Sequence, residues 1–360
     1  MLRRASSECH PEKLSTPPAA ASARLEVRGL TCEGWFQRVS NPSSPHQTSS
    51  VAPPRVSVIV ALYNRLDLTQ EFHASLPRTL PADLAWELIY VDDGSTDGTR
   101  AWLGALPPPA RVILNERNLG YAASNNRGAR AAAGEFLVLL NNDLVLTHGW
   151  LEPMLAAFGR FPRAGLVGNL QRDAGTGVLD HAGVFINSKG KPEHDRTLPC
   201  LHRLRAYREV AALTGACLVV PRQTYLDLGG FDERYVNGCE DIDLCLRARL
   251  AGWRHYVALR SVIDHHISAS RGRQLRDEEN CFRLTRVWRD TLTSLAAQAW
   301  CRDFIANPFG RSFVVDYQLA RAALGYHLRL RRRIPPVVHA AVHGAIEREL
   351  ARWREMFGGA

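Results

Sequence analysis

Apolar and polar residues alternate in blocks through the first half of the chain, and the blocks predict strands that alternate with helices. The run RVSVIVALYN (55–64) is rich in β-branched residues, which is typical of a buried strand, and Leu68, Phe72 and Leu76 follow at helical spacing. Similar strands are predicted within 87–97, 111–116 and 135–140, with helices at 102–106 and 121–133. Because the strands are apolar along their whole length, the pattern indicates a mostly parallel sheet covered by helices on both faces.

The second half continues this pattern less regularly. ALTGACLVVP (212–221) and HYVALRSVIDHH (255–266) predict strands, and between them a glycine-containing loop leads into a helix that ends near Gly252. Near the end of the chain a helix is expected over 317–333. Two prolines then interrupt it, and apolar residues recur at helical spacing as far as Phe357.

Composition divides the chain into three parts. Residues 1–53 are rich in Ser, Pro and Ala and have little periodicity, so we expect a largely disordered extension. Residues 54–300 are expected to form the α/β domain, with a nucleotide-binding half at 54–150 and an acceptor half at 151–300. Residues 301–360 are expected to form a basic helical extension.

Polar residues follow the ends of the predicted strands. Ligands bind beyond the carboxyl ends of the strands in such sheets, so these residues should converge on one crevice. They are Asn64, Asp92, Asp93 and Asp143. A strand-end carboxylate can accept hydrogen bonds from a nucleobase or from ribose hydroxyls. The alternative for the DDGSTD segment is an Asx turn or a helix cap.

Asp143 interrupts the apolar stretch FLVLLNNDLVL (136–146). Burying an unpaired carboxylate costs roughly several kcal/mol of folding free energy unless the group takes up a proton and becomes neutral. A positive charge is therefore expected beside it. Mg²⁺ or Mn²⁺ fits, because these ions take oxygen ligands from one or two carboxylates and from substrate phosphates. From the residues alone, a solvated turn is an equal alternative.

A second group of carboxylates, Glu240, Asp241 and Asp243, opens a predicted helix. The helix dipole favours acidic residues there, which explains part of this charge without any function. The loop before it contains Gly238, which indicates a shaped turn rather than a simple cap. His265 and His266 follow the last predicted strand, and imidazole is a common metal ligand, although a pair of histidines is more often structural.

Bulk composition narrows the class of protein. With 46% hydrophobic residues the chain can form a large core, and its net charge of +9 favours an anionic partner without choosing one. The eight cysteines contain no CxxC motif, so neither a zinc ribbon nor a disulfide framework is indicated, and reduced cytosolic thiols are expected. No run approaches the roughly 18 apolar residues of a membrane span. We expect a soluble, cytoplasmic protein.

Six sequence blocks in a fixed order resemble the family 2 glycosyltransferases of the GT-A fold, particularly the rhamnosyltransferase-like bacterial members that build cell-surface polysaccharide. The blocks are VSVIVALYNR, VDDGSTDGT, NLGYAASNNRGARAAAGEFLVLLNND, LTGACLVVPR, GGFDERYVNGCEDIDLCLRARLAGW and HHISASRG. The resemblance covers about residues 54–290. It implies an inverting transfer of a sugar from a nucleotide-diphosphate sugar to a hydroxyl of a saccharide or lipid-linked acceptor.

The resemblance also implies roles for single residues. Asp241, with Glu240, matches the ED motif and is the expected base, and Asp143 with His265 is expected to hold Mn²⁺ or Mg²⁺, His266 being the alternative ligand. The resemblance implies that a further set binds the nucleotide or the donor: Asn64, Asp92, Asp93, Gly120, Asn126 and Asn142. The segment 141–143 keeps only the last carboxylate of the DxD-like metal motif, so Asp143 alone must carry that bond.

Three other classes of protein fit the sequence less well. A dinucleotide-dependent oxidoreductase is disfavoured because no GxGxxG follows the first strand, and a nucleic-acid binder because no binding motif accompanies the LRLRRR cluster (328–333). A sugar-binding module without catalysis is the main alternative, since the metal motif is reduced. The basic cluster and the stretch around Trp353 predict a peripheral contact with the inner face of a membrane, or else a helix packed on the enzyme's own body.

Overall fold

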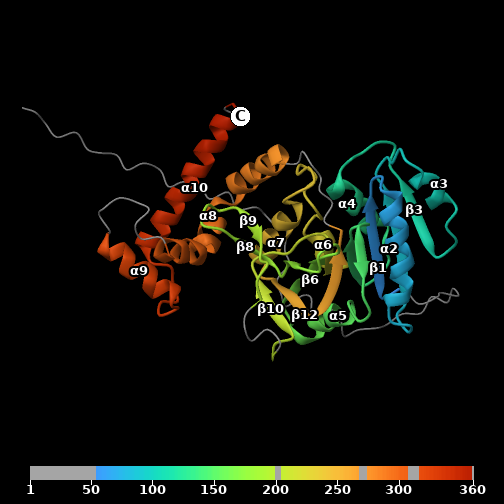
Figure 1. Ribbon diagram of the computed structural model, residues 1–360, viewed down its shortest axis with the longest axis horizontal. Helices are drawn as coiled ribbons and strands as arrows, with labels where there is room; N and C mark the ends of the chain where they lie inside the picture. The colour runs from blue at the N-terminus through green and yellow to red at the C-terminus, as the bar shows by residue number, and fades with distance from the viewer. Residues whose placement is uncertain (1–53, 199–203, 267–273, 307–315, 359–360) are drawn as a thin grey trace, which may run out of the picture. The chain divides into compact units, whose positions relative to one another are not determined.

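Four parallel strands form one half of the central sheet in the computed structural model, which describes residues 54–198, 204–266, 274–306 and 316–358. They lie in the order β3-β2-β1-β4, and helices connect them along the chain (Figure 1). The elements are β1 (Val56–Leu62), α2 (Leu66–Thr79), β2 (Trp86–Asp92), α3 (Thr99–Gly104), β3 (Ala110–Leu114), α4 (Tyr121–Ala131) and β4 (Phe136–Leu140). The strands and helices predicted for this half are therefore present, with ends shifted by a few residues.

The other half of the sheet is mixed, and the expectation of a mostly parallel sheet holds for the first half alone. β11 (Cys217–Pro221) runs antiparallel to both of its neighbours, β4 and β6 (Ala164–Asp173). β12 (Arg254–His265) is parallel to β6 and antiparallel to β10 (Tyr207–Val210). Two short strands, β5 (Leu144–Leu146) and β7 (Leu179–His181), pair with β12 and β6. An apolar run predicts burial but carries no information about strand direction, so the antiparallel pairs were not predicted.

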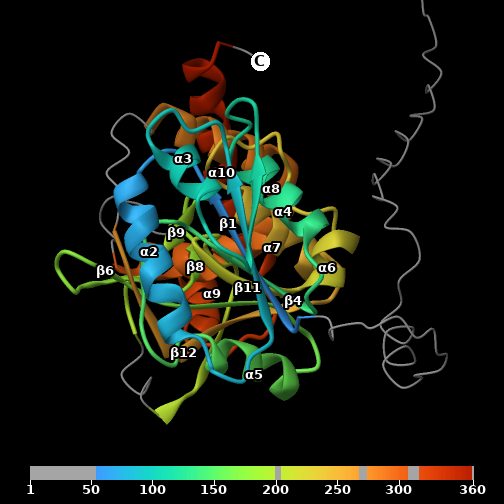
Figure 2. The same ribbon diagram turned by 90° about the vertical axis from the view of Figure 1, so that its right-hand side faces the viewer.

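Side chains of β1 show why both faces of the sheet are apolar. Ile59 packs in the core on the α4 side, whereas Val58 and Val60 pack with Phe72 of α2 on the other side. Figure 2 shows α2 and α4 on opposite sides of β1. Gly128 permits the close approach of α4, because a Cβ there would lie 2.5 Å from a methyl carbon of Ile59. The expected α/β layering is confirmed.

Shorter elements complete the domain. A separate hairpin is formed by β8 (Val184–Ile186) and β9 (Pro192–His194). The remaining helices here are α5 (Glu152–Arg160), α6 (Arg222–Asp227) and α7 (Glu240–Leu250). α7 is the helix that the sequence predicted to end near Gly252.

Three helices close the chain: α8 (Gln274–Ala306), α9 (Tyr317–His327) and α10 (Pro336–Met356). α8 was not predicted, and α9 ends six residues before the expected end at 333 because Arg329 takes a left-handed conformation with φ 57°. α10 runs beside α8 (Figure 1). In the described part of the chain no helix is both long and apolar enough to cross a membrane.

The apolar face of α10 is buried, so it is not the membrane-facing surface that its amphipathic pattern allowed. Ile346 and Trp353 are both 0% exposed and belong to the core that α8 shares. Lys191, in the β8–β9 turn, lies 2.8 Å from Glu278 of α8 and 3.0 Å from Glu349 of α10, and its ammonium lies over the Trp353 ring. The described residues from 54 onward belong to one compact unit. The expected disordered extension, 1–53, lies outside the described residues.

Candidate active site

A pocket of about 870 Å³ opens beyond the carboxyl ends of β1 and β4, where the sequence predicted a crevice. One wall comes from the first half of the chain and includes Asp93 and Asp143. The other lining residues come from the segment 214–216, the start of α7 with Asp241, the β8–β9 hairpin and the start of α8. The pocket therefore brings together Asp93, Asn142, Asp143, Glu240, Asp241 and His265, all of which were predicted as site residues.

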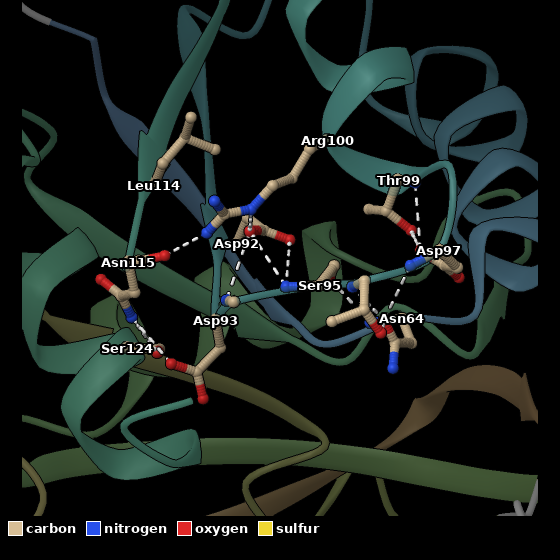
Figure 3. Close-up of polar contacts among 12 residues, drawn as sticks. Asn64, Asp92, Asp93, Ser95, Asp97, Thr99, Arg100, Leu114, Asn115 and Ser124 are labelled. Carbon is tan, nitrogen blue, oxygen red and sulfur yellow. Dashed lines mark hydrogen bonds and ion pairs between the residues drawn. The ribbon is translucent and has the colours of Figure 1, made fainter. Parts of the chain in front are cut away.

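Asp92 is buried behind the pocket wall instead of facing the pocket. Its carboxylate is 0% exposed, forms an ion pair with Nε of Arg100 at 2.7 Å and accepts hydrogen bonds from the backbone N–H groups of Gly94 and Ser95 (Figure 3). Arg100 also donates to the backbone oxygen of Asn115. These contacts fix the turn between β2 and α3, which is the Asx-turn alternative named for this segment.

Asp93 faces the pocket, and its carboxylate organises the loop before α4. Its Oδ1 accepts from the side-chain amide of Asn115 and from the backbone of Leu119, each at 2.8 Å, and its Oδ2 accepts from the backbone of Gly120 at 2.8 Å. Gly120 has φ 93°, a conformation that glycine adopts without a steric penalty. Asp93 and Gly120 thus shape this wall together.

Asn64 and Asn126 join segments of the protein and do not line the pocket. Oδ1 of Asn64 accepts from the backbone of Thr96 at 2.7 Å, which fastens the loop after β1 to the loop after β2 (Figure 3). Asn126 is buried; its amide nitrogen donates to the Phe231 carbonyl at 2.9 Å and its oxygen accepts from the Tyr225 hydroxyl at 2.7 Å. Asn126 therefore ties α4 to the loop that leads toward α7.

The side chain beside Asp143 is His265. Oδ1 of Asp143 lies 3.2 Å from Nε2 of His265, and both residues line the pocket. Nε2 of His266 instead lies 3.3 Å from Glu71 on α2, so the structure favours His265 over His266 at the site. Asn142 lines the same wall, and its amide donates to the Thr69 hydroxyl at 2.8 Å.

Asp143 and His265 offer one carboxylate and one imidazole to a cation. The described residues contain no cluster of three or more His, Cys, Asp or Glu side chains that could hold a metal by themselves. Mg²⁺ and Mn²⁺ in nucleotide sites commonly take one or two protein ligands and fill the remaining positions with phosphate oxygens and water. This donor set therefore fits a cation that binds together with a diphosphate.

Asp241 lines the pocket at the N-terminal end of α7. Its Oδ2 accepts from the backbone N–H of Gly215 at 2.7 Å and its Oδ1 from that of Ile242 at 2.8 Å. Loss of solvent around the carboxylate raises its pKa above the ordinary value, although these two N–H donors oppose the shift. A carboxylate with a raised pKa is a stronger base, which suits proton abstraction.

The neighbouring carboxylates have other partners. Oε2 of Glu240 accepts from the backbone of Gly238 at 2.6 Å, which closes the turn before α7. Asp243 points away from the pocket, where it pairs with Arg247 at 2.7 Å and accepts from the Trp288 indole at 2.8 Å. Glu240 and Asp241 both line the pocket, whereas Asp243 does not.

Sequence reasoning missed the residues that hold Asp241 in place. Tyr121, at the start of α4, donates its hydroxyl to the Gly215 carbonyl at 2.8 Å, and its backbone N–H donates to Asn237 at 3.0 Å. Asn237 and Cys239 both have left-handed conformations, with φ 53° and 69°. Tertiary contacts position these side chains, and no periodic pattern in the sequence signals them. The hairpin residue His194, which lines the pocket beside Glu193, was missed for the same reason.

Known proteins that resemble this chain show its fold and its family. A solved structure, "GalNAc-T7 with UDP, GalNAc and Mn2+", aligns with a TM-score of 0.55 and 16% identity over 78% of this chain and 55% of that one. The fold is the GT-A glycosyltransferase fold. The family model "Glycosyl transferase family 2" matches residues 57–207. The N-acetylglucosaminyl-diphospho-decaprenol L-rhamnosyltransferase of Mycobacterium tuberculosis is 32% identical over 60% of this chain and 77% of its own length. The chain belongs to glycosyl transferase family 2.

Two other relatives are much longer than this chain. An uncharacterised Sinorhizobium fredii protein, y4gI, is 34% identical over 61% of this chain, which spans 25% of that relative. The O-antigen biosynthesis protein RfbC of Myxococcus xanthus is 34% identical over 70% of this chain, which spans 20% of that relative. The chain thus covers a quarter or less of the length of these two proteins.

Proposed function

We propose that this chain transfers a sugar, with inversion at the anomeric carbon, from a nucleotide-diphosphate sugar to an acceptor hydroxyl in the synthesis of cell-surface polysaccharide. The observation that supports the proposal is that Asp241 lines the same pocket as Asp143 and His265. An inverting displacement needs a base on one face of the sugar and a stabilised leaving group on the other. Asp241 is suited to the first task, and Asp143 with His265 to the second.

Asp241 is the proposed base. Its carboxylate opens onto the pocket, its pKa is raised by desolvation, and the N–H groups of Gly215 and Ile242 hold it in one orientation. Positioned general-base catalysis contributes about 10²- to 10⁴-fold to a rate. Glu240 contributes by closing the turn that presents Asp241, through its bond to Gly238.

Asp143 and His265 are the proposed ligands of a Mn²⁺ or Mg²⁺ ion. When bound, such an ion would neutralise charge on the departing diphosphate. Asn142, on the same wall, is a proposed donor contact. The Asp143–His265 pair also explains why a polar segment interrupts the buried stretch 136–146, since the imidazole gives the carboxylate a partner.

The nucleotide is proposed to bind along the wall that contains Asp93. We infer that Asp93 and Gly120 shape its pocket through the loop before α4. Asp92, Asn64 and Asn126 are proposed as positioning residues, because their polar groups are engaged by the protein itself. A base contact by Asp92 would require its ion pair with Arg100 to open.

The donor and acceptor follow from the relatives as proposals. The name of the mycobacterial relative describes transfer of L-rhamnose to a sugar linked to a polyprenyl diphosphate. We therefore propose a nucleotide-diphosphate rhamnose as the first donor to test and a lipid-linked saccharide as the acceptor. Nucleic acid is not among the proposed partners.

A lipid-linked acceptor places the enzyme at the cytoplasmic face of a membrane, and the turn after α9 is the proposed contact. Leu328 and Leu330 are exposed there, and the arginines at 329 and 331–333 are exposed beside them. Exposed leucines among arginines suit an anionic lipid surface. This surface replaces the Trp353 face, which is buried.

The test of the function is turnover of donor. In the presence of Mn²⁺, the full chain is incubated with UDP-, GDP- and dTDP-linked sugars, and release of nucleotide diphosphate is measured with and without a saccharide acceptor. We expect one nucleotide to raise the melting temperature and its sugar to be consumed. Binding without any release of nucleotide diphosphate would favour the alternative, a module that binds sugar nucleotides without catalysis.

A further inference from the structure

Two cysteine side chains meet in the wall of the pocket, and neither has a part in the proposed reaction. Cys239 directly precedes Glu240 and Asp241 at the N-terminal end of α7, and Cys281 lies near the start of α8. Their Sγ atoms are 3.9 Å apart. Both residues line the pocket and are partly exposed. They are 42 residues apart and share no motif, so no pattern in the sequence points to this pair.

We propose that Cys239 and Cys281 form an oxidation site, at which a peroxide or a small-molecule disulfide converts the two thiols into a disulfide beside Asp241. The site itself follows from the geometry of the two thiols. Its effect on activity rests on the function proposed above.

The surroundings of the two thiols differ, and the difference sets the order of reaction. The two sulfurs share one S–H···S contact, which lowers the pKa of Cys281; the charge of Lys191 lowers it further, and burial opposes the shift. The same contact, together with burial, raises the pKa of Cys239 well above the ordinary value. Because the thiolate is the nucleophile, Cys281 is the thiol that reacts first.

The other described cysteines lack these features. Burial raises the pKa of Cys217, of Cys245 and, to about 11, of Cys301. All three side chains are buried, and none lines the pocket. Reactive cysteines are accessible, have a low pKa and often lie next to a second cysteine that resolves the oxidised form. Among the described cysteines, only the pair in the pocket wall meets this description.

The reaction balances with a named oxidant. The Cys281 thiolate attacks one oxygen of a peroxide; an S–O bond forms, the O–O bond breaks, and the other oxygen leaves as water or an alcohol after taking up a proton. The sulfur of Cys239 then attacks the sulfenic acid of Cys281, the S–O bond breaks and a second water leaves. Two thiols are oxidised to one disulfide, and one peroxide is reduced. With a small-molecule disulfide, two exchange steps release two thiols instead.

Closing this bond would move the proposed base. The sulfurs must approach from 3.9 Å to about 2.05 Å, and any part of that movement taken up by the backbone displaces the turn before α7. Cys239 has a left-handed backbone conformation and is the last residue of the turn before α7. Asp241 lies two residues further on, so a movement of Cys239 also moves the start of α7 and Asp241. Since a misplacement of about 1 Å can cost about 10²-fold in rate, we expect the oxidised chain to transfer sugar at least about 10-fold more slowly.

The site is tested on the full chain without any sugar substrate. The reduced chain is treated with hydrogen peroxide or glutathione disulfide, free thiols are alkylated, and the protein is digested without reductant for peptide mapping. We expect a cross-linked peptide pair that contains Cys239 and Cys281 and that dithiothreitol releases. Recovery of both cysteines as alkylated thiols, from a chain that kept its near-ultraviolet dichroism, would overturn the proposal.

Three single variants test the order of attack. In Cys239→Ser, Cys281 should accumulate as a mixed disulfide with glutathione, whereas in Cys281→Ser the Cys239 thiol should stay free. Cys245→Ser, a change in the same helix outside the pocket, should still form the cross-link. Equal modification of Cys239 with and without Cys281 would overturn the proposed order. If the cross-link forms but no donor is turned over in either redox state, the proposed function fails and the oxidation site stands.

Discussion

Replacing Asp241 by asparagine removes the proposed base and keeps the size of the side chain. The structure predicts two separate costs. Loss of general-base catalysis should slow transfer by about 10²- to 10⁴-fold, which is about 2.7–5.4 kcal/mol in the activation free energy. The nucleotide wall is formed by other segments, so the affinity for the nucleotide should be unchanged.

The second cost is a loss of folding stability, and it determines the conditions of the assay. The two oxygens of Asp241 accept from two backbone donors, Gly215 and Ile242. Asparagine offers one oxygen and one amide nitrogen, so one of these N–H groups must face another donor. An unsatisfied buried donor costs about 1–3 kcal/mol, and the variant should unfold at a lower urea concentration. Turnover is therefore measured well below the unfolding transition, in single-turnover reactions with saturating donor.

Asp243→Asn is the matched control. It makes the same chemical change in the same turn of α7, but the Asp243 carboxylate faces Arg247 and Trp288 rather than the pocket. We expect it to lose stability and to retain transfer. Unchanged turnover in Asp241→Asn would refute the role of Asp241. Equal loss of transfer in both variants would show that disruption of α7, rather than loss of a base, explains the effect.

The raised pKa of Asp241 also predicts the direction of the pH dependence. The base must be ionised, so kcat/KM for transfer should fall as the pH drops through the folded-state pKa, which lies above the value of about 3.9 for a free aspartate. Burial that raises this pKa disfavours the ionised form, so this one group should stabilise the fold more as the pH falls through the same range. A pH profile with no acidic limb above about pH 3.9 would contradict this prediction.

Three further changes test other parts of the structure. Asp143→Ala should abolish the dependence of nucleotide affinity on Mn²⁺, as titration calorimetry with and without the ion would show; an unchanged dependence would contradict the assignment. Arg100→Met leaves the Asp92 carboxylate buried without its ion pair and should cost about 2 kcal/mol in urea unfolding, less than a fully buried pair because Arg100 is partly exposed; an unchanged midpoint would refute it. Replacing the arginines at 331–333 by serine should reduce cosedimentation with phosphatidylglycerol vesicles, whereas Arg302→Ser, an exposed arginine on α8, should not.

Much of the first half of the fold could be predicted, because strands buried on both faces appear in the sequence as apolar runs. β1, β2 and β4 were found in this way, and of the polar residues at their ends Asp93 and Asp143 line the pocket whereas Asn64 and Asp92 do not. Apolar runs predict less about the later strands and helices. β11 has the same apolar composition as β4 but runs antiparallel to it, and α8 has too little contrast between its faces to be recognised.

The site shows the limit of arguing from strand ends. Asp92 is the last residue of β2 and Asp93 the first residue after it, and only Asp93 lines the pocket. The sequence could not show which one turns inward, because that depends on Arg100, eight residues later, reaching back to Asp92. The sequence likewise could not show which of His265 and His266 lies at the site, and the structure places His266 beside Glu71 of α2. In each case a partner that is distant in sequence decides the orientation.

The contact of Lys191 with both α8 and α10 shows how far the functional unit extends. The family model matches the chain only as far as residue 207, before Asp241 and His265. The turn of the β8–β9 hairpin is nevertheless held by Glu349 in α10, the last helix. A protein shortened ahead of Pro336 would lose this anchor and would uncover the apolar side of α8. The last helix therefore supports the β8–β9 hairpin, which lines the pocket, and removing it should weaken sugar transfer even though every proposed site residue is still present.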